Sequence, residues 1–457
     1  MRISDVIKWT GAKSTGNIPE ACGAVSQDTR TLGLGALYVA LRGERVDGHD
    51  YVADALARGA AAALVADDWK TPPSLSSAPL LRVKDPLAAL WNLARSWRTS
   101  FSAPQTRIVG LTGSSGKTTT REMIAALLRS EKNRVCATSG NFNNHIGLPL
   151  SVLSMKPDCR FGVFETGVNH PGEMDGLADI LRPDIAVVTN IGNAHIEFFG
   201  TQEAIAAEKG KLLGALPESG FAVLDVDTAC FDVLCGATRA RVVTVSSAGK
   251  DADYSATLLD VLSGRIRIKE RATGAEQEIA CNLPGTHNAA DLLLAYAVAR
   301  ECGVPAEVCP SRLEDFSLPG MRWKSVQRDG ITFVNDAYNA NPQSMEASVR
   351  TFMELPCRGR KVLVLGDMFE LGEQSESLHR SIGALTAQMR PDCVIFVGNA
   401  MAAAAAEARE RGLPASSVFC ADSAISAVPL LAAAVRYGDA VLLKASRGMG
   451  LERVLQQ

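Results

Sequence analysis

The sequence lacks the signals of export, of a membrane span and of a structural metal site. Its start, MRISDVIKWTG, has no charged segment followed by an apolar one, and no apolar run approaches the roughly 18 residues of a membrane span. Its 11 cysteines, scattered from Cys22 to Cys420, include no C-x-x-C pair. An odd number of cysteines without framework spacing favours reduced, mostly buried thiols and argues against a zinc site. We therefore expect a cytoplasmic protein without a membrane span.

A strong excess of charge of either sign is also missing. The 47 basic and 50 acidic residues leave a net charge of −3, so no overall field attracts nucleic acid or an anionic membrane. The content of 47% hydrophobic and 21% charged residues is typical of a globular protein. Partners are therefore expected at individual sites, and nucleic acid is not among them.

The length of 457 residues is too great for one hydrophobic core, and about 150 residues per domain suggests roughly three domains. The polar stretch RTSFSAPQT (98–106) is typical of a linker, and the turn SLPGM (317–321) precedes a new series of strands. These segments divide the chain into an N-terminal domain (1–105), a central domain (106–316) and a C-terminal domain (317–457).

The order of strand and helix patterns indicates an α/β fold. In the central segment, apolar runs such as 183–191 alternate with helical patterns such as 287–302, which is the rhythm of a parallel sheet covered by helices. After residue 321, the runs ITFVND, KVLVLGD, CVIFVG and AVLLKAS repeat this rhythm. We predict a central P-loop mononucleotide-binding parallel sheet, flanked by a smaller N-terminal α/β domain and a C-terminal Rossmann-like α/β domain.

The run VGLTGSSGKTTT (109–120) carries the clearest chemical signal. In the pattern G-x-x-x-x-G-K-[ST], backbone N–H groups cradle phosphate oxygens, the lysine reaches the β and γ positions, and the hydroxyl binds Mg²⁺. Leu111 replaces the first glycine, and a glycine turn that carries Lys-Thr by chance is the alternative. The buried strand pattern before the loop and the helical pattern after it favour a nucleotide site. The predicted phosphate contacts are Gly113, Ser114, Ser115, Gly116, Lys117, Thr118 and Thr119.

A site of phosphoryl transfer needs further metal ligands, which usually lie at the carboxyl ends of neighbouring parallel strands. Glu165 ends the apolar run FGVFE, while Asn190, His195 and Glu197 follow the run AVVT. We expect Glu165 and His195 to join Thr118 in holding Mg²⁺. Taken singly, a capping or solvated carboxylate and a hydrogen-bonded loop histidine are equally good interpretations.

Taken in order, T-G-x-x-G-K-T-T, a strand-end glutamate, N-I-x-x-x-H and H-N resemble the ATP-dependent Mur ligases of peptidoglycan synthesis. The resemblance covers nearly the whole chain and implies ATP and Mg²⁺ as cofactors. The segment 26–65 resembles the family's amino-terminal module, which binds the UDP sugar of the substrate. The implied contacts with that substrate are Asp28, Thr29 and Arg30, and the implied further contacts with the nucleotide are Asn288 (at the adenine), Arg322 and Asp336.

Three runs, GNFNNHIGLP, TGVNHPGEM and DAYNANP, resemble those members of the family that add D-alanyl-D-alanine. The implied partners are two small molecules, UDP-N-acetylmuramoyl-tripeptide and D-alanyl-D-alanine, and we expect a monomer. The further implied substrate contacts are Asn143, Asn144, Asn339, Asn341, Lys444 and Ser446. The chain departs from the family's pattern at Asp291, where a second asparagine is common after H-N, and at Ala445, where glycine is common.

The resemblance also implies the reaction. The γ-phosphate of ATP passes to the terminal carboxylate of the tripeptide, and the amino group of D-alanyl-D-alanine then displaces phosphate from the acyl phosphate. Lys117, His195 and Lys209 are the implied catalytic residues. Lys209 aligns with a lysine that is carbamylated in several members, which would let it hold a second Mg²⁺, and a solvated helix lysine is the alternative.

Two rival functions remain open at this point. One is another amide ligase of the same superfamily, such as a folylpolyglutamate synthase. The other is a P-loop switch that hydrolyses nucleotide without an amine acceptor.

Overall fold

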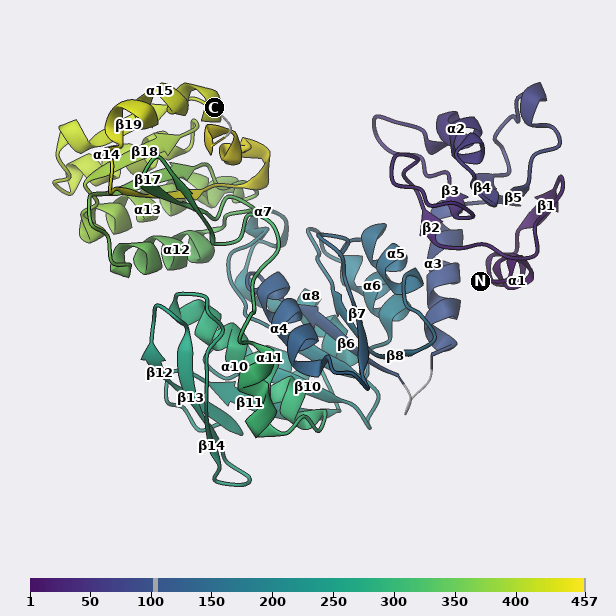
Figure 1. Cartoon of the computed structure of the whole chain (residues 1–457), viewed down its shortest axis with the longest axis horizontal. Helices are drawn as coiled ribbons and strands as arrows, with labels where there is room; N and C mark the ends of the chain where they lie inside the picture. The colour runs from purple at the N-terminus through teal and green to yellow at the C-terminus, as the bar shows by residue number, and fades with distance from the viewer. Residues whose placement is uncertain (102–105, 456–457) are drawn as a thin grey trace.

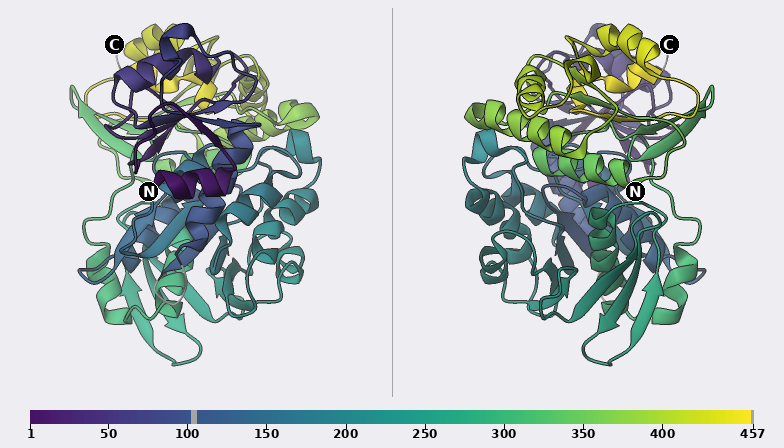
Figure 2. Two further views of the ribbon diagram at one scale, coloured as in Figure 1. Left: turned by 90° about the vertical axis from the view of Figure 1, so that its right-hand side faces the viewer. Right: turned by 90° about the vertical axis from the view of Figure 1, so that its left-hand side faces the viewer.

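The computed structural model describes residues 1–101 and 106–455. It contains three sheets, each with its own helices, and Figure 1 shows them as three bodies along the chain. Both side views in Figure 2 place the N-terminal and C-terminal bodies above the central one. The predicted α/β fold with three domains is confirmed. Residues 102–105 of the predicted linker lie outside the described part of the chain.

The N-terminal sheet has the strand order β1-β5-β4-β3-β2, and all its pairs are parallel except β1 with β5. Its elements are α1 (Ile3–Thr10), β1 (Lys13–Thr15), β2 (Val25–Ser26), β3 (Leu37–Val39), α2 (Val52–Ala57), β4 (Ala62–Ala66), β5 (Leu80–Val83) and α3 (Pro86–Thr99). Helix α3 packs against α5 and α6 of the central domain. The buried Arg98 fixes this contact, because its guanidinium donates to the backbone carbonyls of Leu181 and Arg182.

The central sheet has nine strands in the order β14-β13-β12-β11-β10-β9-β6-β8-β7. Its strands are β6 (Arg107–Thr112), β7 (Arg134–Ala137), β8 (Cys159–Glu165), β9 (Ile185–Val188), β10 (Phe221–Asp225), β11 (Arg241–Ser246), β12 (Tyr254–Asp260), β13 (Arg265–Glu270) and β14 (Glu276–Ile279). Its helices are α4 (Lys117–Leu128), α5 (Gly147–Leu153), α6 (Glu173–Leu181), α7 (Ile196–Phe199), α8 (Gln202–Gly214), α9 (Phe231–Gly236), α10 (Thr286–Glu301) and α11 (Cys309–Arg312).

The central sheet is mixed, which corrects the prediction of a wholly parallel one. β12 pairs with β13, and β13 with β14, in the antiparallel sense. In β13, exposed and buried residues alternate strictly along RIRIKE. That alternation is typical of a strand with one face in solvent, which antiparallel sheets allow and parallel sheets rarely do.

The C-terminal sheet has the order β15-β16-β20-β17-β18-β19 and is parallel except for the edge pair β15–β16. Its elements are β15 (Lys324–Arg328), β16 (Ile331–Asn335), α12 (Pro342–Glu354), β17 (Lys361–Gly366), α13 (Ser375–Met389), β18 (Cys393–Val397), α14 (Met401–Glu410), β19 (Val418–Ala421), α15 (Ala424–Ala434) and β20 (Ala440–Lys444). The four predicted apolar runs are β16, β17, β18 and β20. The two edge strands escaped prediction because β15 is exposed throughout and β19 is short.

The cysteines differ from the prediction at one pair. Cys136 on β7 and Cys159 on β8 form a disulfide, so the expectation that every cysteine is reduced is wrong for these two. Among the free cysteines, burial raises the pKa of the Cys281 and Cys393 thiols to about 11, which disfavours the reactive thiolate. Across residues 1–101 and 106–455, no helix has both the length and the apolar character that crossing a membrane requires.

Candidate active site

The P-loop joins β6 to α4 at the carboxyl edge of the central sheet, as the sequence predicts. Two positions of the loop require glycine, because a Cβ would clash with a neighbouring side chain and the backbone has a positive φ. A Cβ at Gly113 would lie 1.8 Å from Thr189 Oγ1, and Gly116 has a φ of +77° with Asp291 Oδ1 only 2.3 Å from where its Cβ would be. Lys117 Nζ donates to the carbonyl of Gly113 at 2.8 Å and so folds back over the loop.

The loop after β9 locks the P-loop from one side. The N–H groups of Ser114 and Ser115 donate to the backbone and side-chain oxygens of Asn190, each at 3.0 Å. Asn190 Nδ2 in turn donates to Ser115 Oγ at 2.7 Å. The N–H groups of Ser114 and Ser115 are thus already paired. The N–H groups of the first turn of α4, which begins at Lys117, have no partner within the helix. These donors suit an anionic ligand.

Glu165 ends β8 and is 3% exposed. Its carboxylate accepts from Thr118 Oγ1 at 2.9 Å, from Asn143 Nδ2 at 2.8 Å and from Arg121 Nη1 at 3.2 Å. Two predicted metal ligands, Thr118 and Glu165, are thus in contact and offer the oxygen donors that Mg²⁺ prefers. No group of three or more His, Cys, Asp or Glu that could hold a metal occurs in the described residues. An ion at Thr118 and Glu165 would therefore take its remaining ligands from phosphate and water, as Mg²⁺ commonly does.

Cationic side chains outnumber carboxylates around the P-loop. Burial lowers the pKa of Lys117, opposed by the charge of Glu165 and reinforced by that of Arg322. Burial likewise lowers the pKa of Arg322, again opposed by Glu165. Arg121, fully buried, contributes a third positive charge and pairs with both Glu165 and Glu122. The three cations thus outnumber the carboxylates Glu165 and Glu122, and a bound polyphosphate would balance this excess of positive charge.

Lys209 on α8 adds to this imbalance. It is 2% exposed and has no hydrogen bond or ion pair among the residues that the structure describes. Burial lowers its pKa well below the usual range, and the neighbouring charge of Lys117 lowers it further against the opposing charge of Glu208. The alternative of a solvated helix lysine is therefore wrong. A neutral amine at this position can react with CO₂, as carbamylation requires.

The C-terminal domain reaches the P-loop through the segment that follows β16. Asn341 Nδ2 donates to the carbonyl of Ser114 at 3.4 Å, and Gln343 Oε1 accepts from the N–H of Asn193 at 3.2 Å. Arg322 stacks on the ring of Tyr338, 3.8 Å from its centroid. Asn341 therefore bridges two domains while also capping α12 through Ser344.

A buried polar network underlies this segment. Lys444 Nζ donates to Asp336 Oδ2 at 2.6 Å and to the carbonyl of Asn339 at 3.2 Å. Ser446 Oγ donates to the carbonyl of Ala340 at 3.2 Å and accepts from the N–H of Phe369 at 2.9 Å. These predicted ligand contacts thus hold the C-terminal loops in place, and their contact with a ligand stays a prediction.

His195 is hydrogen-bonded to a residue of the C-terminal domain and not to Glu165. Its Nδ1 is hydrogen-bonded to the carboxylate of Glu370, which lies in the C-terminal domain. This hydrogen bond lowers the pKa of Glu370. The predicted metal role of His195 stays a prediction, and Glu197 beside it is exposed.

Helix α10 brings two further residues to the loop. Asn288 is 4% exposed and donates to the carbonyl of Pro284 at 2.7 Å. Asp291, one turn later, faces Gly116, and burial raises the pKa of its carboxyl to about 8. At neutral pH this carboxyl is therefore protonated, and like the amide of asparagine it has both a donor and an acceptor.

The predicted substrate residues of the N-terminal domain lie in the loop after β2. Arg30 pairs with Asp28 at 2.6 Å and holds the pKa of that carboxyl at about 2, while Thr29 is buried. β2 packs against α5, and Asn144 Oδ1 accepts from the N–H of Gly147 at the start of that helix. The two groups of predicted substrate residues therefore belong to adjoining elements.

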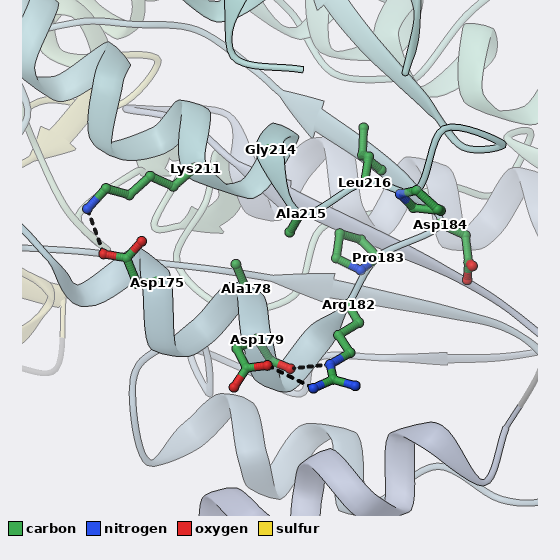
Figure 3. A pocket seen from close by; sticks show the side chains of 11 residues that line it. Asp175, Ala178, Asp179, Arg182, Pro183, Asp184, Lys211, Gly214, Ala215 and Leu216 are labelled. Atoms are coloured by element: carbon green, nitrogen blue, oxygen red, sulfur yellow. Dashed lines mark hydrogen bonds and ion pairs between the residues drawn. The ribbon is translucent and has the colours of Figure 1, made fainter. Parts of the chain in front are cut away.

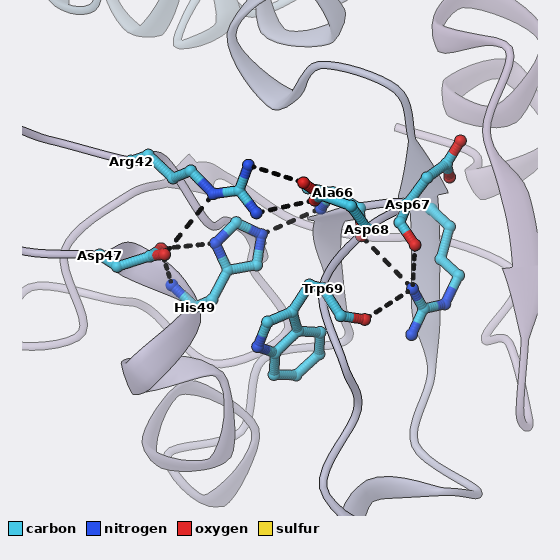
Figure 4. Close-up of polar contacts among 8 residues, drawn as sticks. Arg42, Asp47, His49, Ala66, Asp67, Asp68 and Trp69 are labelled. Atoms are coloured by element: carbon cyan, nitrogen blue, oxygen red, sulfur yellow. Dashed lines mark hydrogen bonds and ion pairs between the residues drawn. The ribbon is translucent and has the colours of Figure 1, made fainter.

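A second polar cluster in the N-terminal domain is structural (Figure 4). The buried ring of His49 contacts Asp47 Oδ1 through Nδ1 at 2.6 Å and accepts from the N–H of Ala66 through Nε2 at 3.0 Å. Arg42 bridges Asp47 and Asp68 over the ring. Both ring nitrogens are occupied, so we assign this histidine to the fold.

A surface pocket of about 580 Å³ is also remote from the P-loop. It lies between the ends of α6 and α8, beside Pro183 and Asp184 at the amino end of β9. The charges at its rim are paired, Lys211 with Asp175 and Arg182 with Asp179 (Figure 3). The P-loop follows the carboxyl end of the neighbouring parallel strand β6, so the pocket and the P-loop lie at opposite edges of the sheet.

Each of the three domains matches a known family model. Residues 23–98 match the model "Mur ligase family, catalytic domain", residues 111–299 "Mur ligase middle domain", and residues 321–447 "Mur ligase, glutamate ligase domain". The UDP-N-acetylmuramoyl-tripeptide--D-alanyl-D-alanine ligase of Bacillus subtilis is 35% identical over 94% of this chain and 92% of its own. The chain belongs to the Mur ligase family.

Solved structures agree with this assignment. MurF from Acinetobacter baumannii superimposes on this Mur ligase with a TM-score of 0.88 at 27% identity, covering 100% of this chain and 98% of the other. MurF from Thermotoga maritima, in complex with ADP, gives a TM-score of 0.79 at 28% identity, covering 95% and 96%. The resemblance found in the sequence is therefore confirmed.

Three residues of the site of this Mur ligase were not predicted from its sequence. Arg121 follows Thr118 by three positions on α4, and that helical spacing places both on one face toward Glu165. Gln343 and Glu370 come from the C-terminal domain and contact the loop after β9. No local pattern marks these last two, because their partners lie 150 and 175 residues away.

Proposed function

We propose that this Mur ligase joins D-alanyl-D-alanine to UDP-N-acetylmuramoyl-tripeptide at the expense of ATP. The relatives that carry this activity in their names match nearly the whole chain at about a third identity. The observation that carries the proposal is the excess of buried positive charge at the P-loop, where Lys117, Arg121 and Arg322 lie near the carboxylates Glu165 and Glu122. Such an arrangement suits ATP and the anionic transition states of phosphoryl and acyl transfer.

The reaction follows from the weak acylating power of a carboxylate. An oxygen of the terminal carboxylate of the tripeptide attacks the γ-phosphorus of ATP, the bond to the β,γ-bridging oxygen breaks, and ADP leaves. The amine nitrogen of D-alanyl-D-alanine then attacks the acyl carbon, phosphate leaves with the electron pair of the C–O bond, and the nitrogen loses a proton. No side chain of the enzyme becomes a covalent nucleophile.

The roles of the side chains follow from their positions. Lys117 and the first turn of α4 neutralise the phosphates, and Arg322 adds positive charge from the C-terminal domain. We infer that Thr118 and Glu165 hold a Mg²⁺, that His195 lies at the same site, and that carbamylated Lys209 holds a second ion. Bound Mg²⁺ would offset the repulsion between phosphate and the attacking carboxylate.

We assign binding of the two nucleotides and domain closure to the three domains predicted from the sequence. Residues 1–105 would bind the UDP moiety through Asp28, Thr29 and Arg30, and residues 106–316 would bind ATP. Residues 317–457 would close over the nucleotide and exclude water that would hydrolyse the acyl phosphate. We further propose that the enzyme acts as a monomer in the cytoplasm, where ATP is available.

The test is an assay of phosphate release with each substrate omitted in turn. A ligase of this kind releases phosphate only when ATP, the UDP-tripeptide and D-alanyl-D-alanine are all present. Steady release without the amine would indicate a nucleotide switch, and release with a glutamate acceptor but not with D-alanyl-D-alanine would indicate a different amide ligase.

A further inference from the structure

The contact between His195 and Glu370 joins two domains at the edge of the candidate site. His195 Nδ1 and Glu370 Oε2 are hydrogen-bonded across 175 residues of sequence. The main chain reinforces the contact, because the N–H of Glu197 donates to the carbonyl of Glu370 at 3.3 Å. Gly372 lies so close that a Cβ there would be 3.1 Å from Glu197 Cγ.

The backbone holds both residues in an unusual conformation for this contact. His195 has a φ of +61° and Glu370 a φ of +63°, a left-handed region that is unfavourable for a non-glycine residue and persists only where the surroundings enforce it. The loop that carries Glu370 is fixed from behind, because Ser446 Oγ accepts from the N–H of Phe369. Glu370 is therefore placed independently of the ring that it contacts.

The chemistry of the pair sets the tautomer of the histidine. An ionised carboxylate only accepts hydrogen bonds, so Nδ1 must carry the proton that lies between the two groups. In a neutral ring, the lone pair is then on Nε2, where it can bind a metal or accept a proton. The carboxylate belongs to the C-terminal domain, so this arrangement exists only while that domain is seated on the central one.

We propose that Glu370 is a positioning residue, which fixes the tautomer and orientation of His195 when the C-terminal domain closes. The inference rests on the proposed function, in which His195 acts at the P-loop site. Glu370 would thus couple closure of the domains to catalytic competence.

The test uses two variants of the full-length enzyme. Glu370→Gln keeps an oxygen that can accept from Nδ1, and Glu370→Leu does not. Partners of this kind typically contribute about 10- to 100-fold to activity or metal affinity, so we expect kcat to fall in that range for Glu370→Leu and by less for Glu370→Gln. KM for ATP should change little in either. Glu373→Gln, at an exposed position of the neighbouring turn η4 (Gly372–Gln374), is the matched control and should keep wild-type kcat.

A readout without turnover separates positioning from a general structural effect. In ¹⁵N NMR spectra of the enzyme with a non-hydrolysable ATP analogue and the UDP-tripeptide, the His195 ring should be mainly the Nδ1–H tautomer in the wild type and in Glu373→Gln. It should lose that preference in Glu370→Leu. In a His195→Ala background, Glu370→Leu should cost no further activity.

Two outcomes would overturn the inference. One is an unchanged tautomer in Glu370→Leu, and the other is an equal loss of kcat with and without His195. Should the wild type fail to ligate the two substrates, the proposed function falls, and the tautomer comparison still decides the role of Glu370.

Discussion

The burial of Lys209 next to another lysine favours its carbamylation. Its ammonium would be costly at 2% exposure beside the positive Lys117, since no opposite charge pairs with it among the described residues. Carbamylation would replace the cation with an anion and relieve the repulsion. A carbamate is also an oxygen ligand for a divalent cation.

We expect Lys209→Ala to be nearly inactive and to be partly rescued by a short carboxylic acid that occupies the vacated space. Turnover should rise with the concentration of the acid. Lys117→Ala is the control, because it loses a cation: we expect it to lose about 100-fold or more of turnover without rescue. Full activity of Lys209→Ala without added acid would show that the lysine has no part in the reaction.

The buried carboxyl of Asp291 should make the free energy of unfolding depend on pH. Burial raises the pKa of its carboxyl from 3.8 to about 8, with the charge of Asp225 acting in the same direction. The folded chain therefore keeps a proton that the unfolded chain releases, so the free energy of unfolding falls as pH rises from about 4 to about 8.

Asp291→Asn removes that loss while keeping a donor and an acceptor. At pH 8.5 we expect the variant to be more stable than the wild type by up to about 5 kcal/mol, because the rise in pKa from 3.8 to about 8 corresponds to about 1.4 kcal/mol per pKa unit, and to unfold at a correspondingly higher temperature. At pH 5 the difference should be smaller. Asp232→Asn, at an exposed position, should match the wild type at both pH values, and a pH-independent difference for Asp291→Asn would contradict the assignment.

At the scale of elements, two helices of the C-terminal domain begin with the same motif but have different surroundings. Asn341 caps α12 and Ser423 caps α15, each in a capping box with the residue three positions on. Only Asn341 also donates to the P-loop, at the carbonyl of Ser114. A comparison of variants at Asn341 and Ser423 can therefore distinguish the effect of losing a helix cap from the effect of losing a contact between domains.

We expect Asn341→Ala and Ser423→Ala each to lower stability by about 1 kcal/mol through loss of the cap. Only Asn341→Ala should also raise the KM for ATP, by about fivefold, because a hydrogen bond contributes about 1 kcal/mol. Thermal unfolding and steady-state kinetics measure the two effects. Equal KM values for both variants would show that the bridge to Ser114 contributes nothing to nucleotide binding.

At the scale of the whole molecule, the C-terminal domain is seated on the central one through side chains that surround the P-loop. Its only covalent link to the central domain is the segment between α11 and β15, from residue 313 to residue 323. We expect this segment, with Gly320 at a φ of +78°, to serve as the hinge of domain closure.

We expect a non-hydrolysable ATP analogue together with the UDP-tripeptide to compact the enzyme. The reason is that the ligands would neutralise the cations that Lys117 and Arg322 contribute from opposite domains. Small-angle scattering should give a smaller radius of gyration with both ligands than with neither. An unchanged radius would mean that the closed contacts persist without ligand.

Features encoded by neighbouring residues could be predicted from the sequence. The P-loop is contiguous, so its glycines, Lys117 and Thr118 define a site without reference to the rest of the chain. Glu165 was recognisable because an apolar run ends at it, and the buried helical face of α4 because Met123, Ile124, Leu127 and Leu128 follow the helical period.

The sequence by itself thus determined the α/β order of elements, the phosphate loop and, through its ordered motifs, the family. Only the tertiary structure decided which distant groups meet: the pairing of His195 with Glu370, the approach of Arg322 to Glu165, and the burial of Lys209 beside Lys117. It also decided the antiparallel extension of the central sheet and the disulfide between Cys136 and Cys159. The physical reason is that backbone periodicity and loop geometry are local, whereas charge pairing and burial depend on how whole domains pack against one another.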